Sequence, residues 1–385
     1  MTFMRIAWCI ILLLFLVISC VKPRNDKTDL VSIDLFAGEQ KEMKLEDIAD
    51  SVSFVHLETN DSCLIKESTR LYVTSSYILK INPLGGAYLF DRETGKFLRE
   101  IGKYGQGPDE YLMIPFNSFD ENNNVLYADK TLSYWIGYDL HTGKKVCEVK
   151  RPSLNKYHTL TYKDGIPRFF RIDSAHYIAY VNNMLGQEPL RLVVFDKNGN
   201  VIKIYPNDRS LEKKIRGPYL FTGTYYFRNK DLYFFENNFD TIYEIKEDLI
   251  PYAAFNRGGD VVSYEERLMF YQYPDILFVD CVFETDKFIL FNYEFKRKAG
   301  VGYYDKKNEK TYLKKLDISK GSTYFQGFRY KGLNLYPRYL NLKQELCGFI
   351  YAQDLLSEEI LKLNPAFRGI KEDDNPIIFI IHLKK

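Results

Sequence analysis

The chain has few of the residues that carry most enzyme and metal chemistry. Its 385 residues include only 5 His, 6 Cys and 2 Trp. No Cys-x-x-Cys pair or Cys/His cluster occurs at the spacing of zinc ligands, which excludes the common zinc sites. The Gly-x-Ser-x-Gly motif of serine hydrolases is absent too. We therefore expect no metal and no cofactor, and the sequence identifies no catalytic residue.

The chain also lacks an excess of either charge. Its 53 Lys and Arg residues are balanced by 51 Asp and Glu residues, for a formal net charge of +2. A nucleic-acid-binding domain concentrates basic residues on one face, so we expect no nucleic-acid partner. No long Gly-, Ser- or Pro-rich stretch interrupts residues 34–385, which predicts a single domain.

Residues 1–19 have the features of a bacterial lipoprotein signal peptide. Arg5 supplies the positive charge, Ile6–Val17 is an almost unbroken apolar run, and Val17–Cys20 resembles a lipobox. This resemblance implies that Cys20 takes a diacylglyceryl group and becomes the new N-terminus. A plain signal peptide or a membrane anchor is the alternative, although the apolar run is shorter than the ~20 residues that span a bilayer. Residues 20–33 are polar, contain Pro23 and lack periodicity, so we predict a flexible tether.

Four cysteines remain once Cys9 and Cys20 are set aside: Cys63, Cys147, Cys281 and Cys347. An extracytoplasmic compartment would permit two disulfides, in any of three pairings. However, the cysteines lie far apart in the sequence, and the last three fall in apolar strand patterns. We therefore expect buried free thiols rather than a disulfide framework.

One hairpin pattern recurs five times along the chain. An aromatic residue precedes an acid, and a polar turn leads into a second strand; the acids are Asp91, Asp139, Asp196, Glu244 and Asp305. Successive acids are 48, 57, 48 and 61 residues apart. A hairpin repeat of about 40–50 residues is typical of a β-propeller blade. The four aspartates recur too regularly for a catalytic acid, so we expect them to cap turns.

We predict an all-β fold, a six-bladed β-propeller closed by an N-terminal strand; seven blades is the alternative. Strand patterns between residues 68 and 316 account for five blades. The sixth contains Gln344–Ala352 and Pro376–Lys384 but lacks its last strand. Val52–Glu58 is expected to complete it, because closure removes the free edges that an open ring would expose.

Two short helical inserts are expected outside the blades. A capping box at Ser263 and Glu266 predicts a helix that runs to about Gln272. The second insert has an apolar helical face formed by Leu355, Leu356, Ile360 and Leu363. Both inserts are interpreted as structural rather than partner-binding helices.

Several motifs resemble a known family. Ile101–Tyr111 resembles the inter-blade loop of NHL-type propellers, and Asn124–Asp129 matches the second strand of that repeat. Leu45–Thr59 and Asp373–Ile378 resemble the first and last segments of six-bladed β-propeller lipoproteins of Bacteroidota. The resemblance covers essentially the whole mature chain. It implies a propeller in the cell envelope, and the family has no established activity, so no functional residue is carried over.

The glycines of the inter-blade loop are expected to shape its backbone. Gly102, Gly105 and Gly107 would adopt φ values that other residues resist, and Pro108 would fix the exit of the loop. Their spacing, with a strand following, does not match a dinucleotide-binding fingerprint.

The residues after Cys20 bear on location. Val21 stands where an aspartate would retain a lipoprotein at an inner membrane. Lys22 and Arg24 occupy the region where surface lipoproteins of Bacteroidota usually carry acids. We therefore expect a lipid-anchored outer-membrane protein that faces the periplasm rather than the cell surface.

Four residues are candidate ligand contacts. Trp135, the one tryptophan of the mature chain, could stack on a sugar or else belong to the core. Arg168 and Arg171 begin one blade, and Arg216 begins another. They could bind an anionic ligand from the central channel, or else be ordinary loop or surface arginines.

We expect a monomeric, non-catalytic binding or assembly module that presents a channel mouth to a peptide, a glycan or an envelope protein. Its membrane contact would be made through the N-terminal lipid. The alternative is a hydrolase or lyase with carboxylates and histidine in the channel. Carboxylates about 5–10 Å apart, or three ligands around a cation, would favour the enzyme. A channel lined by Tyr, Phe and isolated arginines would favour binding.

Overall fold

The protein is described from a computed structural model. The described residues are 30–41, 44–65, 70–82, 85–115, 118–154, 168–181, 183, 186–213, 223–228, 231–236, 239–256, 263, 265–266, 277–296, 298–315 and 327–384. Within these residues, no helix has both the length and the apolar character needed to cross a membrane.

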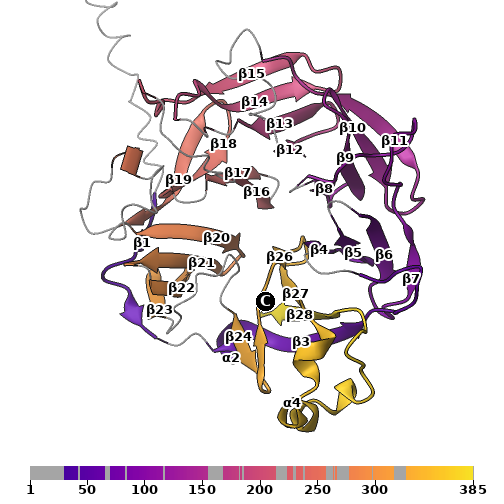
Figure 1. The fold of residues 1–385 in the computed structure, drawn as a ribbon. Helices are drawn as coiled ribbons and strands as arrows, with labels where there is room; N and C mark the ends of the chain where they lie inside the picture. The colour runs from indigo at the N-terminus through magenta and orange to yellow at the C-terminus, as the bar shows by residue number, and fades with distance from the viewer. Residues whose placement is uncertain are drawn as a thin grey trace, which may run out of the picture.

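Six sheets stand around a common axis and form a closed ring (Figure 1). Blade one contains β4 (Arg70–Val73), β5 (Tyr77–Ile81), β6 (Ala87–Asp91) and β7 (Phe97–Glu100). Blade two contains β8 (Phe119–Asp120), β9 (Val125–Thr131), β10 (Tyr134–Asp139) and β11 (Lys145–Lys150). Blade three contains β12 (Arg168–Arg171), β13 (His176–Tyr180), β14 (Leu190–Asp196) and β15 (Val201–Pro206).

The second half of the ring repeats this order. Blade four contains β16 (Gly223–Arg228), β17 (Asp231–Glu236), β18 (Thr241–Ile245) and β19 (Leu249–Asn256). Blade five contains β20 (Phe278–Glu284), β21 (Phe288–Phe295), β22 (Lys298–Asp305) and β23 (Lys310–Lys315). A small hairpin of β24 (Phe328–Tyr330) and β25 (Leu333–Leu335) then precedes blade six.

Blade six joins the two ends of the chain. Its strands are β26 (Tyr339–Leu340), β27 (Glu345–Ile350), β28 (Ile377–Leu383) and β3 (Ala49–His56), in that order. β3 pairs antiparallel with β28, from His56 opposite Ile377 to Ala49 opposite Leu383. The predicted six blades and the predicted closure are therefore confirmed. The two-residue β26 was not anticipated, because a strand so short leaves no alternating pattern in the sequence.

The residues before β3 run along the outer edges of two blades. β1 (Val31–Asp34) pairs parallel with β19, and β2 (Glu39–Gln40) pairs parallel with β23. The short helix α2 (Leu45–Ile48) then leads into β3. The boundary expected between tether and propeller at residues 33 and 34 falls inside β1. Ile33 is fully buried between blades four and five, and this burial holds the segment on the ring.

The repeated aspartates cap turns, as predicted. Asp91 Oδ1 accepts hydrogen bonds from the backbone N of Thr94 at 2.8 Å and from its hydroxyl at 2.7 Å. The carboxylates of Asp139, Asp196 and Asp305 accept equivalent turn amides. The outer hairpins of blades one, two, three and five are thus each closed by an aspartate, which gives these side chains a structural role.

The glycines of three of these turns contact the preceding blade. Gly95, Gly143 and Gly199 have φ values of +69°, +71° and +78°. A Cβ at Gly95 would lie 1.9 Å from the carbonyl oxygen of His56 in β3. A Cβ at Gly199 would lie 2.7 Å from the carbonyl oxygen of Arg151, just after β11. The repeat therefore encodes contact between blades as well as a turn within each blade.

The described core is divided into six hydrophobic clusters, one between each pair of neighbouring blades. Cys63 and Cys347 are fully buried as free thiols in the cluster between blades six and one. Cys147 is a free, half-buried thiol. The expectation of buried free thiols is thus met at two positions and partly at a third. The side chain of Cys281 lies outside the described part.

The helical inserts differ in part from the prediction. The hydroxyl of Ser263 accepts from Glu266 N, and Ser263 N donates back to the Glu266 carboxylate, so the capping box is confirmed. Residues 267–272 lie outside the described part. The second insert is not one helix: η3 (Ala352–Leu355) precedes α4 (Glu358–Leu363), and η4 (Pro365–Phe367) follows. Ser357 caps α4 and so separates it from Leu355.

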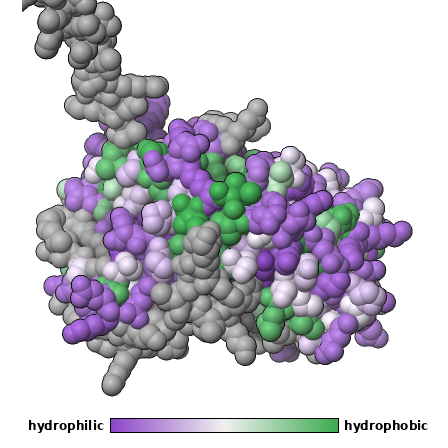
Figure 2. All heavy atoms as spheres, turned by 90° about the horizontal axis from the view of Figure 1, so that it is seen from above, coloured by the Kyte–Doolittle hydropathy of each residue, from purple (hydrophilic) through white to green (hydrophobic). Residues whose placement is uncertain are grey.

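Figure 2 shows the ring from the side that is uppermost in Figure 1, where β14 and β15 lie. This face is mostly hydrophilic, with one hydrophobic patch near its middle and smaller ones around it. Hydrophobic side chains are thus concentrated between the blades rather than on this part of the rim.

Candidate functional site

The inner strands β4, β8, β12, β16, β20 and β26 lie nearest the axis of the ring (Figure 1). Four of them end in a charged residue: Asp120, Arg171, Arg228 and Glu284. A catalytic site in the channel would need carboxylates among such residues that are free to exchange protons. The partners of each carboxylate therefore decide between the two functional hypotheses.

Glu284 is enclosed by donors. Its side chain is fully buried and accepts hydrogen bonds from the hydroxyls of Tyr226 at 2.5 Å and Tyr252 at 2.7 Å. Lys306 Nζ lies 2.6 Å from it and Arg228 3.2 Å from it. A carboxylate with four donors is a structural junction between blades four and five rather than a general base.

Glu345, at the start of β27, is held in the same way. Arg92 of blade one lies 2.8 Å from its carboxylate, Asn341 Nδ2 donates at 2.7 Å, and His382 Nδ1 lies 3.1 Å away. Burial alone would raise the pKa of Glu345, but hydrogen bonds from Asn341 and Arg92 and the charges of Arg92 and His382 lower it. This cluster ties the closing blade to blade one.

Glu121, directly after β8, connects two blades that are not neighbours. Its carboxylate accepts hydrogen bonds from the hydroxyl of Tyr339 and, at 3.2 Å, from the backbone N of Leu342. Burial raises the pKa of Glu121 to about 7. In the turn between β26 and β27, Gln344 Oε1 also accepts a hydrogen bond from Asp286 N of blade five. This turn is thus fixed to blades two and five at one end of the ring.

The charged groups at this end of the ring therefore satisfy one another. Asp120 is bound by Asn123 and lies 4.0 Å from Arg171. In the described part of the chain, no group of three or more His, Cys, Asp and Glu residues could hold a metal ion. The arrangement offers a rigid ring, with no free carboxylate pair among the residues named here.

Trp135 lies in the core, whereas a ligand contact by Arg171, whose side chain is 21% exposed, stays a prediction. Trp135 is fully buried between blades two and three, where its ring stacks on Phe169 at 4.0 Å and Arg151 lies over it at 4.5 Å. It has no exposed face for a sugar, so the core alternative holds. Arg171 donates to the carbonyl oxygens of Asp173 and Ser174 in its own turn.

The other candidate positions are not described in full. Arg168 is the first residue of β12, but its side chain lies outside the described part. Arg216 and Cys20 also lie outside it. A role for these three residues therefore stays a prediction.

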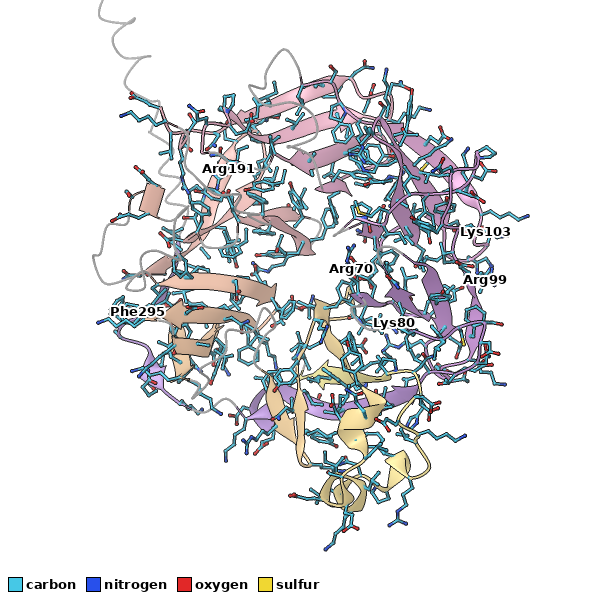
Figure 3. The ribbon with its side chains drawn as sticks, in the orientation of Figure 1. Arg70, Lys80, Arg99, Lys103, Arg191 and Phe295 are labelled. Atoms are coloured by element: carbon cyan, nitrogen blue, oxygen red, sulfur yellow. The ribbon has the colours of Figure 1, made fainter. Side chains whose placement is uncertain are left out.

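A different surface forms a concave site. A groove of about 790 Å³ lies between blades one and two, on the outer side of the ring. Its lining comes from the end of β7, from the inter-blade loop at residues 102–110 and from the hairpin that leads into β11. Figure 3 shows Lys103, from this lining, and Arg99 at the outer rim beside β7 and β11.

Glycines make the groove possible. Gly102 has a φ of +63°, and a Cβ there would lie 2.7 Å from the ring of Tyr138, so the backbone rests directly on that ring. Gly105 and Gly107 do not have positive φ values, contrary to prediction. Space is the reason for glycine at these two positions, because a Cβ at Gly105 would lie 2.1 Å from the carboxylate of Glu110.

Hydrogen bonds fix the loop to blade two. Glu110 accepts from Gly107 N at 2.8 Å, and the hydroxyl of Tyr138 donates to the carbonyl oxygen of Asp109 at 2.9 Å. Lys145 Nζ lies 3.0 Å from the Asp109 carboxylate. Both walls of the groove are therefore held in place without a ligand.

Three charged side chains of the groove have no ion-pair or hydrogen-bond partner among the described residues: Glu100, Lys103 and Lys144. Burial raises the pKa of Glu100, and the charge of Lys103 opposes this effect. Val146, which is part of the lining, adds apolar contact area because it is 54% exposed. The groove therefore offers a ligand both unpaired charges and exposed apolar surface.

Sequence reasoning missed this groove. The only signal was the Gly-rich loop, which was read as a connection between blades. The walls come from positions 100–110 and 138–146, and only the packing of the two blades brings them together.

The fold defines the class of this protein: it is a closed, six-bladed β-propeller. The chain belongs to the family described as "Domain of unknown function (DUF4934)", which matches residues 30–382. No curated protein matches the sequence.

Two solved structures show the same fold. One is a protein from Bacteroides fragilis NCTC 9343 that is named an exported protein; it is 19% identical, with a TM-score of 0.67, over 92% of this chain and 100% of that chain. The other is a member of the DUF4221 family from Bacteroides vulgatus, 12% identical with a TM-score of 0.50, over 87% of this chain and 97% of that chain. At these identities the likeness concerns the fold alone.

Proposed function

We propose that this protein is a lipid-anchored, non-catalytic binding module of the cell envelope, and that its ligand binds in the groove between blades one and two. The observation that carries this proposal is the groove itself, whose walls are fixed while Glu100, Lys103 and Lys144 keep no partner among the described residues. All three side chains are exposed, so their charges are available to a partner from solution. A ligand would supply that partner.

The state of the inner carboxylates also supports binding over catalysis. Glu284 and Glu345 are saturated with donors, and Glu121 braces two blades. A hydrolase or lyase that used one of these three carboxylates would need it to leave its partners during turnover. The ligand classes expected are a peptide, a glycan or an envelope protein.

The envelope location is supported by features outside the propeller. The lipobox-like Val17–Cys20 precedes the family match, which begins at residue 30. The similar protein from Bacteroides fragilis is named an exported protein. An alkynyl fatty acid should label the wild-type protein in cells and should not label Cys20→Ala, and equal labelling of both would reject the anchor.

Site-specific photo-crosslinking tests the groove. A benzophenone side chain at Val146 would point into it, and the same group at Ile202 is a matched control. Both residues are second in the outer strand of their blade, with exposed fractions of 54% and 56%. In intact cells we expect a defined adduct from position 146 that is absent from position 202. Equal adducts at both positions, or none at 146, would contradict the proposal.

A further inference from the structure

We infer that the groove recognises a ligand that carries both a primary ammonium group and a carboxylate, as a short peptide with free ends does. Glu100 would bind the ammonium group, and Lys103 with Lys144 would bind the carboxylate. This inference rests on the proposed function and adds the chemistry of the ligand. It follows from which charges the fold leaves unpaired and where they lie.

Glu100 is held in a position that favours an ionic partner. It is the last residue of β7 and pairs across the sheet with Tyr88 of β6. A Cβ at Gly86 would lie 2.9 Å from Glu100 Oε1 and 3.0 Å from the Tyr88 hydroxyl, so the carboxylate rests over a glycine beside a phenol. Its side chain is exposed and accepts no hydrogen bond from the described residues, although the atoms around it partly desolvate it and raise its pKa. An ammonium group would offer it charge-assisted hydrogen bonds.

The two lysines come from opposite walls. Lys103 follows β7 in the inter-blade loop, and Lys144 lies in the hairpin turn before β11. Both side chains are exposed and form no ion pair with the described residues. Lys145, the first residue of β11, instead forms ion pairs with Asp109 at 3.0 Å and Glu148 at 2.7 Å. Two free ammonium groups in one groove are well placed to bind a carboxylate.

The apolar part of the lining fits a peptide better than a sugar. A sugar site usually offers the face of an aromatic ring, but Tyr138, the one aromatic residue of the lining, is only 1% exposed. Pro108 and the exposed Val146 provide aliphatic surface instead. The volume of about 790 Å³ lies within the usual range of small-ligand pockets, roughly 300–1,000 Å³. A peptide of a few residues suits this space.

Binding should depend on pH through Glu100. The titratable groups whose charges interact with it are Lys103, Tyr88 and Tyr111. Burial raises the pKa of Glu100, so the carboxylate becomes protonated at a higher pH than an exposed glutamate. A protonated Glu100 cannot neutralise an ammonium group. Affinity should therefore fall as pH is lowered through the raised pKa.

Calorimetric titration of the full mature chain tests this inference with three probes: trialanine, N-acetyl-trialanine and trialanine amide. We expect trialanine to bind, and we expect acetylation or Glu100→Gln to weaken binding tenfold or more. In Glu100→Gln, acetylation of the peptide should cause no further loss of affinity, because the carboxylate that binds the amine is absent. Glu93→Gln changes an exposed turn glutamate of the same blade and should leave affinity unchanged. Lys103→Met with Lys144→Met should remove the preference for trialanine over its amide.

Two results would overturn the inference. One is equal affinity of wild type for trialanine and its acetylated form, and the other is unchanged affinity in Glu100→Gln. Failure of all three probes, together with a defined adduct at position 146, would reject the ligand class and leave the proposed function standing. Failure of the probes without any adduct would reject both.

Discussion

At the scale of single residues, the acid and the glycine that recur in the outer hairpins of blades one to three have two separate tasks. The aspartate closes the turn within its own blade, and the glycine lets that turn approach the outer strand of the blade before it. Both tasks depend on backbone contact, so they tolerate little change of side chain. Gly95 is the clearest case, since it supports the seam between blades six and one.

Gly95→Ala should therefore destabilise the protein by more than the strain of an alanine at a positive φ. A Cβ there lies 1.9 Å from the His56 carbonyl oxygen, in addition to the strain of a positive φ, which costs about 1–3 kcal/mol. Gly369→Ala is the matched control, because Gly369 has a φ of +92° and nothing within 4 Å of its Cβ position. Melting temperatures should fall in both variants, and further in Gly95→Ala. Equal falls would show that the contact with β3 carries no energy.

Lys80 of β5 is a buried amine that has no hydrogen-bond partner among the described residues. It is fully buried between blades six and one, its Nζ lies 3.5 Å from the centre of the Phe349 ring, and it makes no hydrogen bond to the described residues. Figure 3 shows it nearer the axis than Lys103. Burial and the charge of Arg338 hold the pKa of Lys80 well below its usual range.

Lys80→Met should stabilise the protein at pH 7 by about 1–4 kcal/mol, as replacements of buried charges by apolar residues can. The unfolded chain binds this proton more tightly than the folded chain, so wild-type stability rises with pH up to the normal lysine pKa. The gain from the substitution should consequently shrink between pH 7 and pH 10. Thermal unfolding at the two pH values measures it, with the exposed Lys197→Met as control. A gain that does not change with pH would contradict this account.

At the scale of elements, the N-terminal residues do more than connect an anchor to a domain. β1 and β2 extend blades four and five, and β3 completes blade six. The two kinds of contact differ in extent: β1 has four paired residues on β19, whereas β3 pairs along the full length of β28. We expect their energetic contributions to differ accordingly.

Two truncations separate these contributions. A chain that begins at residue 44 loses β1 and β2 but keeps the closing strand, and its melting temperature should fall by a few degrees. A chain that begins at residue 58 also loses β3, which opens the ring and exposes the edge of β28. We expect a further fall on the order of 10 °C, or loss of the cooperative transition. Calorimetry compares the two chains, and equal transitions would show that β3 is not needed for closure.

At the scale of the whole molecule, side chains at one end of the ring connect blades that the chain places far apart. Glu121 links blade two to blade six, and Arg92 with Glu345 links blade one to blade six. A propeller without such links is held mainly by contacts between neighbouring blades. The additional links make the ring a stiff support for the groove on its rim.

Glu121→Gln should change how the stability of the protein depends on pH. Because burial raises the folded-state pKa of Glu121 to about 7, the folded chain binds its proton more tightly than the unfolded chain. The stability that this proton contributes is complete at acidic pH and is lost as pH rises through 7. The variant lacks this loss, so its stability relative to wild type should improve by roughly 1–3 kcal/mol from pH 5 to pH 8. Thermal melts at both pH values measure the difference, with Glu93→Gln as control; a constant difference would contradict the assignment.

Sequence and tertiary structure determined different parts of this protein. The period of the hairpin acids, the alternation of Val52–Glu58 and the turn chemistry of Asp91 are local patterns, and they sufficed to predict six blades, their closure and the capped turns. Such features follow from the backbone and from neighbours a few residues away.

The candidate site could not be predicted in this way. The isolated arginines and Trp135 were reasonable candidates for ligand contacts from their residue types. In the folded chain, however, the indole is buried and Arg171 donates hydrogen bonds to its own turn. The partners of Glu121 are more than 200 residues away in the sequence, and the walls of the groove come from two different blades. Which charges are left without a partner is decided only when distant segments meet, because burial and pairing are properties of the packed ring rather than of any one segment.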